Sequence, residues 1–201
     1  MDAPLLLALA RAQLRRHGAW ALEGAWASDR ALGLRWGRRP ESDTWILLLQ
    51  PRPALWRLPA NHLAAQLLAA EARKDSPRAW GAWLSGARLV EVQGDPAERW
   101  LGFVFQRRAI TGKLETVRVA FQAIPGRAGI RLDGLDTAAP RLGLGVPFPA
   151  APPAPEGEPP PLRRWKERFG DRLPAVLAGE VDEALPGEGD LLDRHRALSE
   201  A

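Results

Sequence analysis

Arginine is the side chain that offers the most chemistry in this sequence. Of the 28 Lys and Arg residues 25 are Arg, whereas there are three His and no Cys. Without cysteine, the sequence excludes disulfides, thiolate catalysis, zinc fingers and iron–sulfur clusters. The histidines lie far apart and lack a metal-binding spacing, so we expect no metal and no other cofactor. A guanidinium presents a planar fork of donors that suits phosphate, and the expected chemistry is therefore anion binding.

The basic residues are concentrated in the first part of the chain. Residues 1–150 hold 21 Lys or Arg and 13 Asp or Glu, a net charge of +8, whereas residues 151–201 hold 7 and 11, a net charge of −4. A GC-rich genome would also produce the excess of Arg over Lys and the nine Trp without Tyr. Composition alone therefore does not indicate nucleic-acid binding, and the clustering of the cations is the stronger signal.

Several cations fall at predicted turns, where they would form a basic rim for an RNA backbone. They are Arg38, Arg39, Arg107, Arg108, Lys113 and Arg118. The same residues are equally compatible with solvated turn charges.

The elements that must position these residues follow from hydrophobic spacing. Pro4 and the leucines after it predict an opening helix that ends at Gly18. Apolar residues two apart are typical of half-buried strands. Strands are expected over residues 20–26, 32–36, 45–49, 55–58, 88–93, 99–107, 114–122 and 130–132, and helices over 61–73 and 76–86. This order predicts an α+β fold, an antiparallel β-sandwich flanked by helices.

The tryptophans and two leucines of the second helix give expectations about the core. Leu63, Leu67 and Ala70 are expected to point inward. Trp100 alternates away from Leu101 and is the candidate exposed aromatic for base stacking, whereas Trp165 is interpreted as a helix anchor. The remaining tryptophans considered fall on predicted core faces: Trp20, Trp26, Trp36, Trp45, Trp80 and Trp83.

A proline-rich stretch divides the chain. Eight prolines lie between Pro147 and Pro161, which cannot pack as regular structure. We expect a domain over 1–150, a linker over 151–161 and a small helical segment over 162–201, which is too short to hold a core alone and should dock on the larger domain, dock on a partner or stay mobile. No stretch is long and apolar enough to span a membrane, and the opening residues lack the positively charged stretch that begins a signal peptide. We therefore expect a cytoplasmic protein.

Four blocks of sequence and an exit motif, taken in order, resemble the N-terminal domain of the NFACT family, which includes bacterial RqcH, also called fibronectin-binding protein A. The resemblance covers residues 4 to about 155. The blocks are Leu5 to Trp36, Trp83 to Leu89 (similar to "HLxGxRI"), Glu98 to Leu101 (similar to the "DRI" strand) and Val117 to Asp133 (similar to "GRxSNIIL"), followed by Gly145 to Pro153 (similar to "GxxYxxPP").

The resemblance implies a fold and a function. The fold is related to the N-terminal domain of formamidopyrimidine-type DNA glycosylases, and the function is ribosome quality control through binding of tRNA and the large ribosomal subunit. Glu98 and Arg99 match the family's acidic–basic pair that engages tRNA. The family's second RNA-binding domain would then be a separately encoded partner. The glycosylases attack with an N-terminal Pro followed by Glu, but this chain begins Met1-Asp2-Ala3, so their amine nucleophile is absent.

The residues themselves allow specific roles at this pair and at a glycine-rich loop. Arg99 would contact phosphate or stack on a base while Glu98 orients its guanidinium, although an ordinary cross-strand ion pair is the alternative. Arg127 lies between glycines that let the backbone approach a ligand closely. The predicted RNA-binding residues are therefore Glu98, Arg99, Trp100, Arg107, Arg108, Lys113 and Arg127.

We therefore expect a non-enzymatic RNA-binding or ribosome-associated protein with no catalytic residues. One alternative is a protein-interaction module on the same fold, with the proline-rich segment and the acidic tail as partner surfaces. A glycosylase-like DNA enzyme is a third hypothesis, which the missing N-terminal proline opposes.

Overall fold

The computed structural model describes the chain in several ranges. These are residues 3–18, 20–28, 30–37, 42–50, 52–59, 62–63, 65–67, 69–70, 79–133, 141–143 and 160–178. Arg38 and Arg39 of the predicted rim, most of the proline-rich stretch and the acidic tail lie outside these ranges.

The first sheet is built from the first group of predicted strands. Its antiparallel order is β1-β2-β3-β4, with β1 over Leu22–Ala27, β2 over Ala31–Trp36, β3 over Asp43–Leu48 and β4 over Ala54–Pro59. Residues 45–48 of β3 are continuously apolar, and all four are buried because both faces of the strand are covered. The predicted strand over 55–58 is confirmed as an edge strand.

The second sheet follows from the second group. Its antiparallel order is β5-β6-β7-β8-β9, with β5 over Arg88–Gly94, β6 over Trp100–Arg108, β7 over Leu114–Gln122, β8 over Gly129–Asp133 and β9 over Arg141–Gly143. Strands β6 and β7 are long and pair without interruption from Trp100 opposite Gln122 to Arg108 opposite Leu114. The short strand β9 was not predicted.

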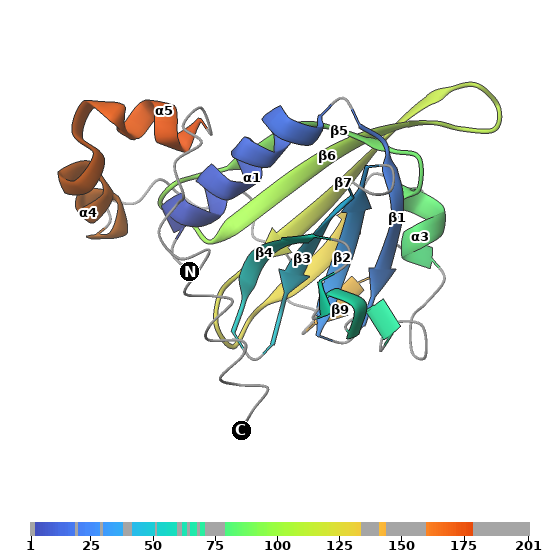
Figure 1. Ribbon diagram of the computed structural model, residues 1–201, viewed down its shortest axis with the longest axis horizontal. Coiled ribbons are helices and arrows are strands. Elements are labelled where there is room, and N and C mark those ends of the chain that lie inside the picture. The colour runs from blue at the N-terminus through green and yellow to red at the C-terminus, as the bar shows by residue number, and fades with distance from the viewer. Residues whose placement is uncertain are drawn as a thin grey trace.

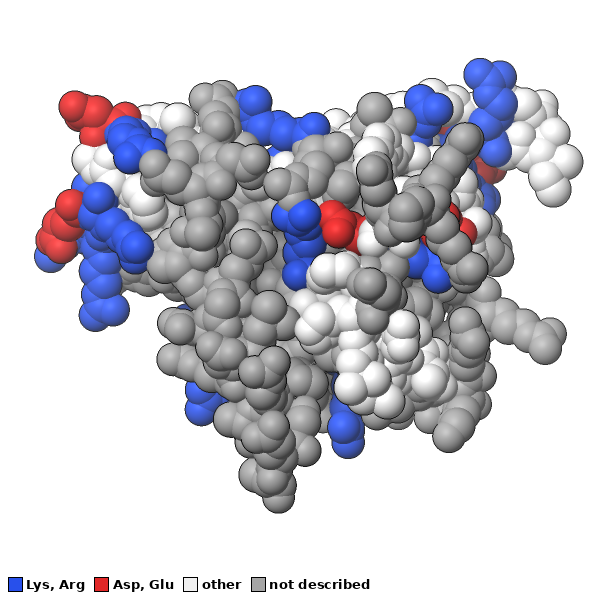
Figure 2. Space-filling view, in the orientation of Figure 1, with Lys and Arg blue, Asp and Glu red and all other residues white. Residues whose placement is uncertain are grey.

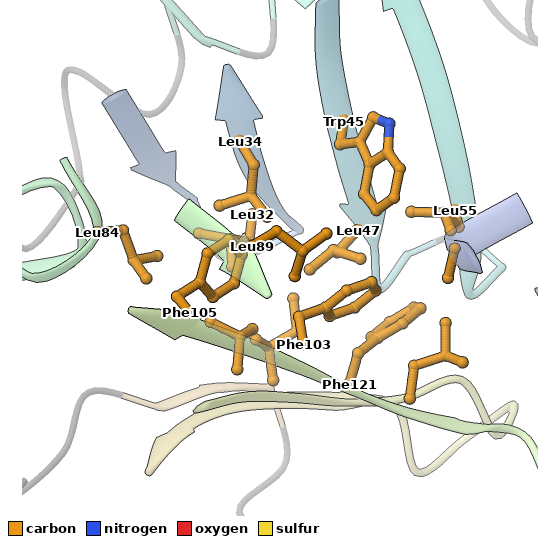
Figure 3. Packing of buried hydrophobic residues seen from close by; sticks show 14 of the residues in the cluster. Leu32, Leu34, Trp45, Leu47, Leu55, Leu84, Leu89, Phe103, Phe105 and Phe121 are labelled. Carbon is orange, nitrogen blue, oxygen red and sulfur yellow. The ribbon is translucent and has the colours of Figure 1, made fainter. Parts of the chain in front are cut away.

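The two sheets pack face to face around one large apolar core (Figure 3). Alternating residues of β6 and β7 point into it, among them Phe103, Phe105 and Phe121, none of which is exposed. The ring of Trp36 stacks on Phe105 with centroids 6.4 Å apart, and Trp45 meets Phe103 edge-on at 5.7 Å. The predicted α+β sandwich is therefore confirmed.

One seam joins the sheets. Ala21 forms a β-bridge with Arg88, and the Leu22 amide donates to the Ala87 carbonyl at 2.7 Å. The short helix α3 (Ala79–Leu84) leads into this seam and places Trp80 and Leu84 in the core, as the sequence predicted.

Helix α1 (Ala3–His17) lies between the sandwich and the C-terminal helices (Figure 1). Leu6, Leu7 and Ala10 enter the main core, while Ala8 belongs to a separate cluster with Trp165. Leu173 and Val176 complete that cluster.

The C-terminal helices are α4 (Pro160–Phe169) and α5 (Leu173–Leu177), joined by a 3-10 turn over Gly170–Arg172. Arg11 and Arg15 of α1 donate hydrogen bonds to the carbonyls of Leu177 and Ala178 at 3.1 and 3.0 Å, where α5 ends. Trp165 is buried, which confirms its interpretation as a helix anchor. The described part of the helical segment therefore docks on the larger domain.

Some core expectations were wrong. Leu63 and Leu67 are 67% and 56% exposed, Ala70 is exposed as well, and Ala65 is the buried residue between the two leucines. Trp20 is also exposed, because the strand begins only at Leu22. None of the described helices is long and apolar enough to cross a membrane.

Candidate nucleic-acid interface

The turn between β5 and β6 carries Glu98 and Arg99. The Glu98 amide donates to the Asp95 carbonyl at 3.1 Å, and the Ala97 amide donates to Oδ1 of Asp95 at 2.6 Å. Asp followed by Pro favours such a turn because the Asp side chain bonds to its own backbone and Pro96 fixes φ. Both Glu98 and Arg99 are half-buried at the entry of β6.

The turn between β7 and β8 carries Arg127. Its amide donates to the Ile124 carbonyl at 3.0 Å, and Gly126 has φ +74°. With Pro125 in the second position and a positive φ in the third, this is a type II turn. A Cβ on Gly126 would meet nothing within 4 Å, so glycine is required there for its backbone angle alone. The turn leaves Arg127 exposed.

Strand register brings these two turns together. Trp100 at the start of β6 lies opposite Gln122 at the end of β7, and the Ala123 amide donates to the Arg99 carbonyl at 2.7 Å. Residues 95–100 and 123–128 therefore lie together at one end of the strands of the second sheet, which we call the turn end. Arg99 and Arg127, both candidates from the sequence, belong to this turn end.

The charges at the turn end are not consumed by internal pairs. Among the residues that the structure describes, Glu98, Arg99 and Arg127 form no ion pair and no side-chain hydrogen bond. The expected orientation of the Arg99 guanidinium by Glu98 is thus not formed, and neither is the alternative cross-strand ion pair. Two guanidinium groups on adjacent turns keep their donors for an external anion.

Trp100 is less open than the sequence predicted. It is half-buried, and the guanidinium of Arg118 lies 5.5 Å from the centroid of its ring. Arg118 lies opposite Val104 in the middle of the sheet and crosses Gly102, where a Cβ would come within 2.9 Å of its Nε. The expectation that Arg118 lies on a turn rim is therefore wrong. One face of Trp100 is already engaged by a cation.

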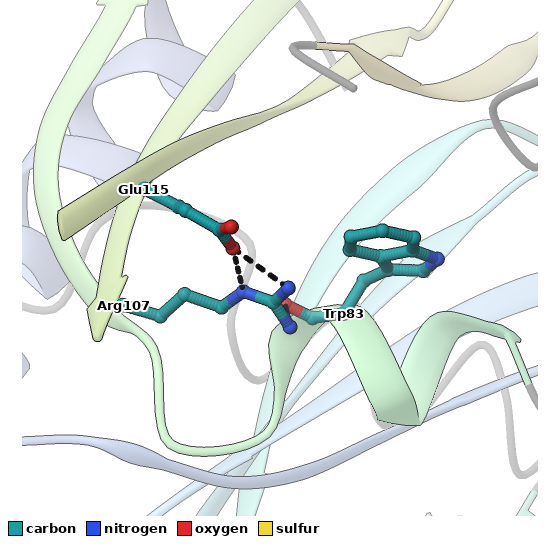
Figure 4. Close-up of polar contacts among 3 residues, drawn as sticks. All are labelled: Trp83, Arg107 and Glu115. Atoms are coloured by element: carbon teal, nitrogen blue, oxygen red, sulfur yellow. Dashed lines mark hydrogen bonds and ion pairs between the residues drawn. The ribbon is translucent and has the colours of Figure 1, made fainter. Parts of the chain in front are cut away.

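Arg107 has an internal role (Figure 4). Its Nε and Nη2 donate to Oε2 of Glu115 at 2.9 and 2.8 Å, and its Nη1 donates to the Trp83 carbonyl at 3.2 Å. The guanidinium also lies 4.8 Å from the centroid of the Trp83 ring. Because its donors are used within the protein, we keep Arg108 and Lys113 as the candidate phosphate contacts in this region.

Arg108 and Lys113 lie at the opposite end of the sheet from Arg99. Both are exposed; Arg108 is the last residue of β6, and Lys113 directly precedes β7. Trp100 and Arg108, at the two ends of β6, are eight residue steps apart, which at about 3.3 Å per step is roughly 26 Å. The predicted RNA-binding residues therefore form two groups instead of one continuous rim.

The sequence interpretation missed one exposed residue of this second group, Ile110. It is fully exposed, and Leu114 next to the strand is 58% exposed. The signal in the sequence was an apolar residue directly before Thr111-Gly112, inside a predicted turn.

No group of three or more metal-ligating side chains occurs within the part of the chain that the structure describes.

Comparison with known proteins gives a fold. No family model matches the sequence, and no curated protein does. The N-terminal domain of fibronectin-binding protein PavA from Streptococcus pneumoniae is similar in structure, with 10% identity, a TM-score of 0.52 and coverage of 98% of this chain and 82% of that one. At this identity the likeness concerns the fold alone. That fold is the one implied by the resemblance to the NFACT family, so this part of the expectation is confirmed.

Two other structures are more distant. The fibrinogen binding protein from Staphylococcus aureus has 10% identity and a TM-score of 0.48, with 69% of this chain and 48% of that chain covered. The N-terminal part of the fibronectin/fibrinogen-binding protein from Streptococcus suis has 15% identity and a TM-score of 0.48, with 68% and 50% covered. The chain spans about half the length of these two proteins.

Proposed function

We propose that this protein binds RNA without catalysing a reaction, and that it acts in ribosome quality control in the cytoplasm. Its ligands would be tRNA and the large ribosomal subunit. A separately encoded RNA-binding domain would supply the second RNA contact that the resemblance to the NFACT family implies.

One observation carries the proposal. Arg99 and Arg127 lie on adjacent turns at the turn end of the second sheet, and among the described residues neither has an ion-pair partner. Arginines without a carboxylate partner are suited to fork-like contacts with phosphate oxygens. Glu98 and Arg99 also occupy the position at which the resemblance expects the tRNA-contacting pair.

The test is tRNA binding measured by fluorescence anisotropy over a salt series. Replacing both arginines, Arg99→Ala with Arg127→Ala, should weaken binding about 30-fold at low salt, because two charge-assisted contacts of about 1 kcal/mol each are lost. The plot of log affinity against log salt should become flatter by about two, since two fewer counterions are released.

A matched control removes the same charge elsewhere. Arg35 and Arg57 are paired with Glu23 and Asp43 at 2.9 Å on the first sheet. The double replacement Arg35→Ala with Arg57→Ala should leave tRNA affinity within about twofold of the unchanged protein, because both guanidinium groups are already bonded to carboxylates and lie on the other sheet. Equal losses in the two double variants would mean that binding follows net charge alone. Absence of any binding by the unchanged protein would end the proposal and favour the protein-interaction module.

A further inference from the structure

The connection between β6 and β7 projects beyond the sandwich (Figure 1). We call residues 108–114 the hairpin tip. The Ala109 amide donates to the Lys113 carbonyl at 2.8 Å, and the Gly112 amide donates to the Ala109 carbonyl at 2.9 Å. Gly112 has φ +82°, which closes the turn in a conformation that other residues rarely adopt. The tip is thus an ordered, narrow protrusion.

The surface of the hairpin tip combines apolar and basic groups. Ile110 is fully exposed at its most distant part, and the tip holds Arg108 and Lys113 but no acidic residue. Figure 2 shows basic side chains beside uncharged surface on this projection. An isoleucine in this position buries no area in the fold, so it contributes nothing to folding through the hydrophobic effect.

Arg107 stiffens the base of the projection. It links β6 to Glu115 of β7 and to the Trp83 carbonyl of α3, so the hairpin is fixed both to itself and to the sandwich. A protrusion that is held in one orientation loses little conformational entropy when it binds. Arg107 therefore acts as a positioning residue for the hairpin tip.

We propose that the hairpin tip inserts into RNA where a helix is interrupted, with Ile110 entering between unstacked bases and Arg108 and Lys113 binding the phosphates on either side. Arg108 precedes Ile110 by two residues and Lys113 follows it by three around the same closed turn, so these two cations are its nearest charged neighbours along the chain. Small apolar wedges between base steps, flanked by basic side chains, are an established way to engage nucleic acids. This inference rests on the proposed RNA binding and adds a site at the opposite end of the second sheet.

A bulged RNA duplex tests the insertion. The probe carries 2-aminopurine beside a single bulged nucleotide, and a fully paired duplex of the same sequence is the reference. The unchanged protein should prefer the bulged RNA and raise its 2-aminopurine fluorescence, because insertion unstacks the labelled base. Replacement Ile110→Ala should abolish the rise in fluorescence and weaken binding to the bulged RNA about tenfold, while binding to the paired duplex is retained.

The flanking cations should behave differently from the wedge. The double replacement Arg108→Ala with Lys113→Ala should weaken binding to both RNAs and flatten the salt dependence by about two. Replacement Leu63→Ala is the matched control, because it also removes three carbons from an exposed aliphatic residue and should change neither the affinity nor the fluorescence.

The outcomes separate this inference from the proposed function. Suppose that Ile110→Ala has the same affinity and fluorescence response with bulged RNA as the unchanged protein, while Arg99→Ala with Arg127→Ala still weakens tRNA binding. The insertion is then overturned and the proposed function stands. If the hairpin tip binds an acidic protein surface and not the bulged RNA, the insertion is likewise overturned. If the unchanged protein binds neither the bulged RNA nor tRNA, both proposals fail.

Discussion

The two ends of the second sheet are built from the same strands but expose different chemistry. At the turn end, Arg99 and Arg127 are carried by two short turns close to the body, and their charges lack partners among the described residues. At the other end the strands run on into a projection, where Arg107 is used internally and Ile110 is fully exposed. Basic residues next to each other in sequence can therefore have different environments: Arg107 is bonded inside the protein, whereas Arg108 is exposed.

The largest effect is expected from a substitution in the core of the sandwich, because both ends of the second sheet depend on the packing there. Phe103 lies in the middle of β6, is fully buried and meets the ring of Trp45. Replacement Phe103→Ala should lower the free energy of unfolding by about 3–5 kcal/mol, because it leaves a cavity in the core. Urea denaturation followed by circular dichroism measures this loss. Both RNA-binding activities should disappear at the same urea concentration, and separate midpoints would show that the two ends fold independently.

The next largest effect is expected from the same substitution, Gly to Ala, made at each end of the second sheet. Gly126 and Gly112 have φ +74° and +82°, and a Cβ on either would meet nothing within 4 Å. Replacement of either by Ala should cost about 1–2 kcal/mol through backbone strain alone. Gly126→Ala should weaken tRNA binding, whereas Gly112→Ala should reduce the preference for bulged RNA. The reverse pattern would contradict our assignment of the two sites.

A smaller effect is expected from the support of the hairpin. Replacement Arg107→Ala removes a half-buried ion pair and should lower the free energy of unfolding by about 1 kcal/mol. The fluorescence rise with bulged RNA should shrink, although Arg108, Lys113 and Ile110 are all present. Replacement Arg107→Lys keeps the charge but not the planar fork, so it should restore the response only in part. A full response with Arg107→Ala would show that the hairpin needs no support.

The smallest effect is expected away from both ends. Arg57 donates to Oδ2 of Asp43 at 2.9 Å on the edge strand of the first sheet. Replacement Arg57→Ala should change the free energy of unfolding by at most about 0.5 kcal/mol and leave tRNA binding unaltered. A clear loss of affinity would place part of the binding surface on the first sheet.

Local pattern predicted most of the fold for a physical reason. In β6 the alternation of Leu101, Phe103 and Phe105 reflects a sheet with one face on the core, and in β3 the uninterrupted run reflects burial on both faces. Hydrophobic spacing gave the wrong buried face for the helix that holds Leu63 and Leu67. Leu63 and Leu67 share a helical face with each other but not with Ala65, and only the tertiary packing decides which face is buried.

The candidate site could be predicted only in part. The resemblance to the NFACT family located Glu98 and Arg99, and the glycines on either side of Arg127 located that residue. The internal role of Arg107 depends on Glu115 across the hairpin and on a carbonyl of Trp83, 24 residues earlier. The first partner follows once the hairpin register is known, but the second depends on where α3 packs. Spacing along the chain contains no such information.

The position of α1 has a consequence for synthesis of the chain. Among the described elements this helix is made first, yet its Ala8 side packs against the C-terminal helices, through residues that include Trp165, Leu173 and Val176. A ribosome must add about 160 further residues before that cover exists, and during this time the side of Ala8 is open to water or to a chaperone. Maturation of the amino terminus therefore waits for the last described helix to emerge.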